Sequence, residues 1–197
     1  MTLYHKVRAV EREFRNLEKE VAAFQQATKL SCLARCGKCC QRPDIAATPL
    51  EFLPLAYHLF KSGEAEAWYY KLGEMQGDLC PLFQPLLREQ DLGFCGNYPY
   101  RGLICRLFGY AATTDKWDKF KLVTCKPLKT EKTNSVEQAQ AYIDEGGPVP
   151  IMRNYQLRLM GIAPELSRKQ VPIWEAIREA LQVVLSYYAF RRPRKSS

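Results

Sequence analysis

Histidine is nearly absent from this chain, which contains only His5 and His58 among its 197 residues. A metal site that needs several imidazole ligands, such as an HExxH zinc site, therefore cannot be assembled from it. A glycine-rich phosphate loop, a GxSxG nucleophile motif and a paired-carboxylate arrangement are absent as well. No catalytic residue can be named from the sequence, and whether the protein is an enzyme stays open.

Long apolar runs are also missing. The N-terminal segment MTLYHKVRAVEREFRNLEKEV carries charges throughout and has no apolar h-region, and no segment approaches the ~20 apolar residues of a membrane span. We therefore expect no membrane span and a cytoplasmic location. Cysteines stay reduced in that compartment, so clustered cysteines are interpreted first as metal ligands or redox groups.

Cysteine, by contrast, is concentrated. The segment SCLARCGKCC, residues 31–40, holds four of the eight cysteines, and Gly37 permits a tight turn that lets their sulfurs converge. Thiolates without imidazole favour zinc or iron–sulfur clusters over magnesium or calcium. The predicted metal ligands are Cys32, Cys36, Cys39, Cys40, Cys80, Cys95, Cys105 and Cys125.

The spacing within this segment has two further readings. Adjacent side chains normally point apart, so we expect Cys39 and Cys40 to serve two different metals or to bridge two sites. Cys32, Cys36 and Cys39 also match the CxxxCxxC that holds the cluster of radical-SAM enzymes. In those enzymes the motif follows the first strand of a partial α/β barrel, whereas a long helix precedes it here. Only the capacity to bind a [4Fe-4S] cluster is retained from that comparison.

The strongest periodicity predicts an amphipathic helix that ends at about residue 28. Over only three heptads such a seam can form a coiled coil with a second molecule, but packing against the protein's own helices is the favoured interpretation. The seam consists of Leu3, Val7, Val10, Phe14, Leu17, Val21 and Phe24.

Capping signals predict further helices. Thr48 and Glu51 form a capping box, and Pro54 is expected to bend the helix that follows or to delay its start. Ser135 and Gln138 form a second capping box. The expected helices cover about 49–62, 64–75, 135–145, 151–160 and 171–190.

The remaining segments complete the predicted architecture. Residues 76–107 show little periodicity and are expected to be irregular, while two β-prone runs in 109–125 predict one hairpin. The fold class is mainly α, with a helical body around a cysteine-rich, largely irregular metal-binding centre and at most a short β-hairpin. We expect a single domain over 1–197, divided into an N-terminal amphipathic helix (1–29), a cysteine-cluster core (30–127), C-terminal helices (128–190) and a basic tail (191–197).

The formal net charge is +8, and basic residues are most concentrated in the tail RRPRKSS. A disordered, solubilising end is the favoured interpretation of this tail, and contact with nucleic acid or an anionic surface is the alternative. The basic residues of the tail are Arg191, Arg192, Arg194 and Lys195.

Three motifs occur in a specific order along the chain: CLARCGKCC, then CPLF at 80–83, then CGNYPYRGLICRLFGY at 95–110. Together they resemble the YkgJ-like CxxCxxCC cysteine-cluster family, a zinc- or iron-chelating domain, over about residues 30–127. Gly102 stands where that family usually has proline. The resemblance implies metal or iron–sulfur binding and supplies no substrate. The matched positions are Cys32, Cys36, Gly37, Cys39, Cys40, Cys80, Pro81, Cys95, Tyr98, Arg101, Cys105, Arg106 and Phe108.

Two arginines flank the Cys105 motif. Arg101 and Arg106 are predicted to offset the negative charge of bound thiolates, the alternative being a surface salt bridge for each. Asp44, Glu51 and Asp91 could ligate a metal or accept a proton, but loop acids and a capping glutamate explain them more simply.

Two hypotheses follow. In the first, the protein is a cytoplasmic cysteine-ligated metalloprotein with iron or one or two iron–sulfur clusters, redox-active or acting on a partner macromolecule. In the second, zinc stabilises a structural module that binds a protein or, through the basic tail, a nucleic acid.

Overall fold

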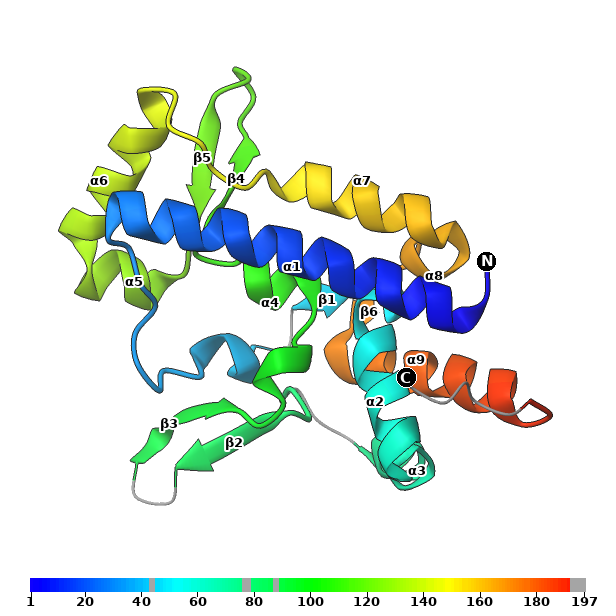
Figure 1. The fold of residues 1–197 in the computed structure, drawn as a ribbon. Helices are drawn as coiled ribbons and strands as arrows, with labels where there is room; N and C mark the ends of the chain where they lie inside the picture. The colour runs from blue at the N-terminus through cyan, green and yellow to red at the C-terminus, as the bar shows by residue number, and fades with distance from the viewer. Residues whose placement is uncertain (43–44, 76–78, 87–88, 192–197) are drawn as a thin grey trace.

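The computed structural model is mainly α-helical, as predicted, and describes residues 1–42, 45–75, 79–86 and 89–191. Helix α1 (Leu3–Thr28) crosses the molecule, and α7 (Met152–Ile162) lies alongside it (Figure 1). The α1 seam packs against the protein's own elements, which confirms the favoured interpretation. Its buried members are Leu3, Val7, Val10, Phe14, Leu17 and Phe24.

The main hydrophobic core contains buried residues of α1, α7 and several further elements. The position of Pro54 predicted a bend in the second helix or a delay in its start. The delayed start is confirmed, because a 3-10 turn precedes this helix. Gly63, with a φ of 80°, ends this helix. The elements around this core are η2 (Pro49–Phe52), α2 (Leu53–Ser62), α3 (Ala65–Glu74), α9 (Ile173–Tyr188), and the short antiparallel pair β1 (Ala46–Ala47) and β6 (Val171–Pro172).

A second, smaller core lies at the other end of α1. The hairpin predicted in 109–125 is confirmed as β4 (Ala111–Thr114) and β5 (Phe120–Val123). It packs with α5 (Lys126–Glu131), which was not expected, and with α6 (Thr133–Asp144). Helix α6 begins before Ser135, so the predicted Ser135–Gln138 capping box is wrong. The buried residues here are Phe24, Leu30, Ala112, Leu128, Ala139 and Ile143.

The expectation that 76–107 is irregular was wrong in part. An antiparallel hairpin and two short helices lie there, so the strand content exceeds the single hairpin predicted. These elements are too short to show a period in the sequence, and they depend on contacts with distant segments. They are β2 (Phe83–Leu86), β3 (Glu89–Cys95), η3 (Tyr98–Tyr100) and α4 (Leu103–Leu107).

The four-residue helix α8 (Pro164–Ser167) joins α7 to β6. Among the described residues, no helix has both the length and the apolar character that crossing a lipid bilayer requires.

Candidate metal centre

The cysteine-rich segment is a loop that ends in the 3-10 turn η1 (Lys38–Gln41). Gly37 adopts a left-handed φ of 57°, and the Cys40 N–H donates to its carbonyl at 2.9 Å, which confirms the predicted tight turn. A Cβ on Gly37 would lie 2.6 Å from the Phe83 ring, so the loop also approaches β2 too closely for any other residue.

Backbone hydrogen bonds connect this loop to the β2–β3 hairpin. The Gly93 N–H donates to the Arg35 carbonyl at 3.0 Å, and the Cys80 N–H donates to the Cys40 carbonyl at 2.9 Å. Cys95 ends β3, and Cys105 lies in α4. These contacts bring cysteines from three separate stretches of sequence into one region.

Four thiols, those of Cys40, Cys80, Cys95 and Cys105, form what we call the Cys40 group. For Cys40, a hydrogen bond with Cys39 lowers the pKa, but a hydrogen bond with Cys80, burial and the charges of Cys80 and Cys95 raise it to about 12. Burial, and then the charges of Cys39, Cys40, Glu51 and Cys95, raise the pKa of Cys105. Cys80, Cys95 and Cys105 also pack against the main core.

The Cys32 group consists of Cys32, Cys36 and Cys125. Burial is the main cause of the raised pKa of Cys32, and the charges of Cys36, Cys39 and Cys125 add to it. Cys125 packs against the second core, and its sulfur accepts the Leu128 N–H at 3.4 Å. The Cys32 group therefore lies at the smaller of the two cores.

Cys39 interacts with both groups. Its thiol shares a hydrogen bond with Cys40, which, with burial, raises its pKa well above the usual range. Its charge also acts on Cys32, Cys95 and Cys105. The expectation that Cys39 and Cys40 point apart is wrong, because the 3-10 turn places neighbouring side chains closer than an extended strand would. Through Cys39, interactions between thiols connect all eight predicted ligands.

The chemistry of this donor set fits a soft metal. All eight cysteines are free thiols, and none is fully buried. Within the described ranges, no group of three or more histidine, cysteine, aspartate or glutamate side chains has the arrangement needed to hold a metal ion. The sulfurs are thus neighbours that share charge and hydrogen bonds, and ligation requires them to draw closer.

Two polar groups accompany the Cys32 group. The Tyr110 hydroxyl accepts the Cys32 N–H at 2.7 Å. Burial raises the pKa of Tyr110, whereas hydrogen bonds from the Cys32 backbone and the Gln25 side chain act to lower it. The Thr124 hydroxyl, next to Cys125 in the sequence, is buried without a hydrogen-bond partner.

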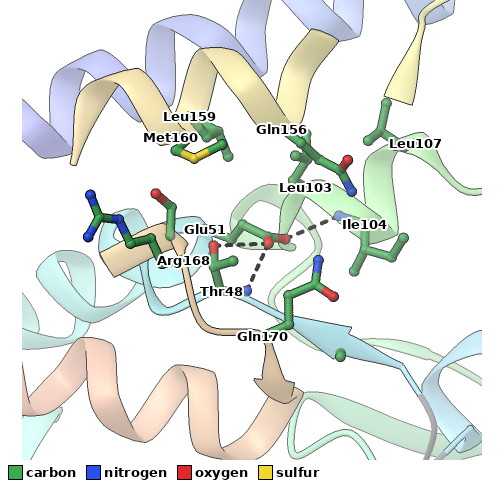
Figure 2. A pocket seen from close by; sticks show the side chains of 12 residues that line it. Thr48, Glu51, Leu103, Ile104, Leu107, Gln156, Leu159, Met160, Arg168 and Gln170 are labelled. Atoms are coloured by element: carbon green, nitrogen blue, oxygen red, sulfur yellow. Dashed lines mark hydrogen bonds between the residues drawn. The ribbon is translucent and has the colours of Figure 1, made fainter. Parts of the chain in front are cut away.

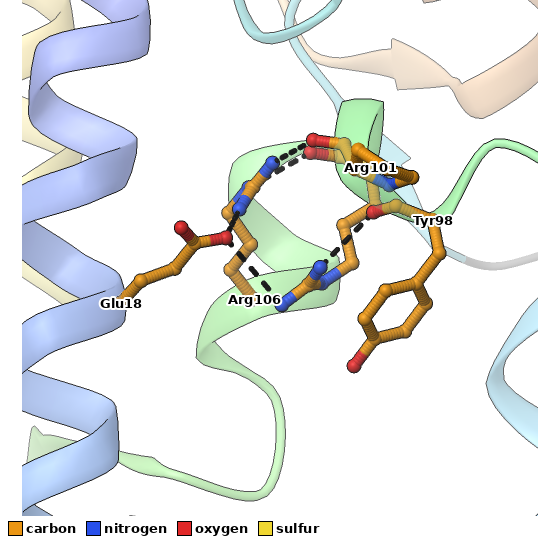
Figure 3. Close-up of polar contacts among 5 residues, drawn as sticks. Glu18, Tyr98, Arg101 and Arg106 are labelled. Atoms are coloured by element: carbon orange, nitrogen blue, oxygen red, sulfur yellow. Dashed lines mark hydrogen bonds and ion pairs between the residues drawn. The ribbon is translucent and has the colours of Figure 1, made fainter.

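The two arginines have different surroundings (Figure 3). Arg106 is 4% exposed; its guanidinium pairs with Glu18 of α1, lies 4.4 Å above the Phe14 ring and donates to the Pro99 and Arg101 carbonyls at 2.6 and 3.0 Å. Arg101 donates to the Tyr98 carbonyl at 3.0 Å and also pairs with Glu18 at 3.9 Å. Burial raises the pKa of Cys95, while a hydrogen bond with the Asn97 backbone and the charge of Arg101 act to lower it. The charges of both arginines therefore interact with thiols, Arg101 with Cys95 and Arg106 with Cys105, and Arg106 also fixes the 99–101 turn against α1.

Glu51 is a capping residue, as predicted. Its buried carboxylate accepts the Thr48 N–H at 2.8 Å, the Thr48 hydroxyl at 3.1 Å and the Ile104 N–H at 3.2 Å (Figure 2). It lies in the wall of a cavity of about 230 Å³ between η2, α4 and α7. With both oxygens engaged, Glu51 has little capacity left for a metal. Asp44 lies outside the described residues, and the Asp91 side chain is not described.

The two histidines contact other side chains. His5 hydrogen-bonds to Thr2, and His58 stacks on Tyr100 with ring centroids 4.4 Å apart. The described part of the tail is Arg191, whose guanidinium lies over the Tyr187 ring at 4.5 Å. The predicted tail residues Arg192, Arg194 and Lys195 lie outside the described residues.

Sequence reasoning missed Tyr110, Gln25 and Glu18 as neighbours of the cysteine motifs. Tyr110 is the last residue of the third motif, and this position is a weak sequence signal for a role close to the cysteines. Gln25 and Glu18 carry no such signal, because they belong to the outer face of α1 and meet the motifs only after folding.

Comparison with known families then identifies the cysteine region. A family model named CxxCxxCC, described as "Putative zinc- or iron-chelating domain", matches residues 31–139, which is more than half of the chain. No curated protein and no solved structure matches the chain.

Proposed function

The chain belongs to the CxxCxxCC family of zinc- or iron-chelating domains, and on this premise we propose that its eight cysteines bind iron as iron–sulfur clusters. The interconnected set of eight free thiols carries the proposal. Both histidines make contacts elsewhere, so the available ligands are all sulfur. Such a donor set favours iron–sulfur clusters or zinc.

The ligand number supports clusters. A [4Fe-4S] cluster takes four cysteine ligands, and eight cysteines suffice for two such clusters. The Cys40 group supplies four thiols, and the Cys32 group with Cys39 supplies four more. In this assignment the ligands are Cys40, Cys80, Cys95 and Cys105 for one centre, and Cys32, Cys36, Cys39 and Cys125 for the other.

The arginines support the negatively charged centre in different ways. Arg101, whose charge opposes the rise that burial causes in the pKa of Cys95, offsets thiolate charge. Arg106 holds the turn between Cys95 and Cys105 against α1. When bound, a cluster would supply one-electron transfer, and the protein would use it in a redox reaction or to act on a partner macromolecule.

Elemental analysis of the anaerobically purified, full-length protein tests the proposal. We expect iron and acid-labile sulfide in equal amounts, at four to eight of each per chain for one or two clusters, together with a brown colour. A metal-free protein that stays colourless and binds no iron on anaerobic reconstitution with iron and sulfide would overturn it.

A zinc-stabilised structural module is the second candidate. The family description names zinc, and four thiolates in a tetrahedral arrangement suit a zinc ion. The net charge of +8 admits a nucleic-acid partner for such a module. Stoichiometric zinc without iron in the same analysis would favour this candidate, and partner affinity would then fall steeply with added salt.

A further inference from the structure

The Tyr110 hydroxyl touches the first cysteine of the segment from 78 residues away, and the proposed metal site does not yet use it. Its oxygen accepts the Cys32 N–H at 2.7 Å, which is a short hydrogen bond for an N–H donor. The contact ties the beginning of the cysteine loop to the segment that follows α4.

The backbone aims Tyr110 at Cys32. Gly109, with a left-handed φ of 90°, turns the chain after α4. The Gly109 N–H donates to the Val123 carbonyl at 2.8 Å, and the Tyr110 N–H donates to the Leu107 carbonyl at 2.9 Å. The backbone at Tyr110 is therefore fixed from both sides, by α4 and by β5.

A phenol has one O–H donor and accepts up to two hydrogen bonds. The Cys32 N–H occupies one acceptor position, and the Gln25 side chain shares a further hydrogen bond with this hydroxyl. The phenol also carries an O–H donor, since it is protonated at neutral pH. The charge of Cys32 acts on this phenol, and its sulfur is a hydrogen-bond acceptor once it is a thiolate.

We propose that Tyr110 is a positioning residue of the metal centre, donating its O–H to the sulfur of metal-bound Cys32. This inference rests on the proposed function, because it requires Cys32 to be a ligand. The bond orients the Cys32 side chain and withdraws electron density from its sulfur. Hydrogen bonds to ligand sulfurs stabilise the reduced state of an iron–sulfur cluster and raise its reduction potential.

Tyr110→Phe in the full-length, iron-loaded protein tests this inference, because it removes only the hydroxyl and keeps the ring. The matched control is Tyr100→Phe, whose hydroxyl bonds to His58 at 3.0 Å and lies between Cys95 and Cys105 in the sequence. We expect Tyr110→Phe to lose its metal to a chelator about tenfold faster, the lower end for outer-shell partners, and to shift the midpoint potential to more negative values. Tyr100→Phe should change neither.

A second measurement reports on the hydrogen bond itself rather than on the rate of metal loss. Exchange into D₂O should shift the metal–sulfur stretching modes in resonance Raman spectra, and the shift should be smaller in Tyr110→Phe. An unchanged potential and unchanged isotope shift in Tyr110→Phe, or equal changes in Tyr100→Phe, would overturn the inference. A wild type without metal would instead refute the proposed function itself, so the two failures are distinguishable.

Discussion

At the scale of single residues, the cysteines would repel one another as thiolates. Burial and neighbouring thiols raise the pKa of Cys32, Cys39, Cys40 and Cys105 in the metal-free chain. These groups are therefore protonated at neutral pH, and only a bound cation makes thiolates stable so close together. Metal binding and proton release are thus coupled.

This coupling predicts the pH dependence of metal binding. Each thiol must lose its proton to ligate, so affinity should rise with pH up to the raised pKa values and fall about tenfold per proton for each unit of acidification. Calorimetric titration of the metal-free protein with zinc, in buffers of different ionisation enthalpy, should show the release of several protons per metal. Binding without proton release would contradict the assigned ligands.

Substitution of one thiol separates metal ligation from binding through the tail. In Cys36→Ser the hydroxyl stays protonated and is a poor ligand for a soft metal, so the protein should lose one metal centre and keep its helices. Arg191→Ala should leave the metal content unchanged. Metal analysis and circular dichroism of both variants check this. Full metal content in Cys36→Ser would remove Cys36 from the ligand set.

Arg106 is the residue at which a stability change is easiest to foresee. Arg106→Met keeps the length of the side chain but leaves the Pro99 and Arg101 carbonyls without their donor and the Glu18 carboxylate with Arg101, at 3.9 Å, as its partner. Since Glu18 is half exposed and can be hydrated, we expect a loss of about 2–3 kcal/mol in the free energy of unfolding. Arg8→Met breaks an exposed pair with Glu11 and should cost less than about 1 kcal/mol in the same urea titration.

At the scale of elements, the cysteines depend on short helices and turns that cannot stand alone. Helix α4, which carries Cys105, has only five residues. Its Ile104 N–H donates to Glu51, so the capping box before α2 also holds the beginning of α4. One buried carboxylate therefore couples the main core to a ligand-bearing helix.

Removal of this carboxylate should affect both elements. Glu51→Ala leaves the Thr48 and Ile104 N–H groups buried without acceptors, and we expect it to reduce the free energy of unfolding by about 2–4 kcal/mol. It should also accelerate metal loss to a chelator, because Cys105 is held less firmly. Glu165→Ala, which removes a largely exposed carboxylate paired with Lys6, should cost less than about 1 kcal/mol and leave metal loss unchanged. Equal effects of the two substitutions would contradict the coupling.

At the scale of the whole molecule, the thiols lie between two cores of unequal size. The Cys40 group packs against the main core, and Cys125 packs against the smaller one around Phe24 and Leu128. Structural thiolate sites contribute on the order of 10 kcal/mol to small domains, comparable with the net stability of a chain of this size. A metal at this position would join the two cores.

Removal of the metal should therefore loosen the protein unevenly. After anaerobic chelation, hydrogen exchange should accelerate first in the cysteine loop, in the β2–β3 hairpin and in the elements of the smaller core from β4 to α6. The amides of α2 and α9, buried in the main core, should stay protected. Uniform protection across the metal-free chain would contradict this prediction.

The sequence by itself determined the elements whose signals are local. The seam of α1, the capping box at Thr48, the delayed start at Pro54 and the hairpin before Cys125 were predicted correctly, because periodicity and capping act within a few residues. The composition of the candidate site, which has eight thiols and no imidazole, could also be predicted from the sequence. The family match confirms the metal-binding class, while the individual ligands stay a prediction.

Only the tertiary structure decided how those parts meet. The β2–β3 hairpin was not predicted, since it is ordered by hydrogen bonds to a loop about 50 residues earlier in the chain. The capping box proposed at Ser135 was overridden by α5, which continues almost directly into α6. The pairing of Arg106 with Glu18 and of Tyr110 with Cys32 joins residues 88 and 78 positions apart. Such contacts leave no local pattern, because they depend on the packing of whole elements against one another.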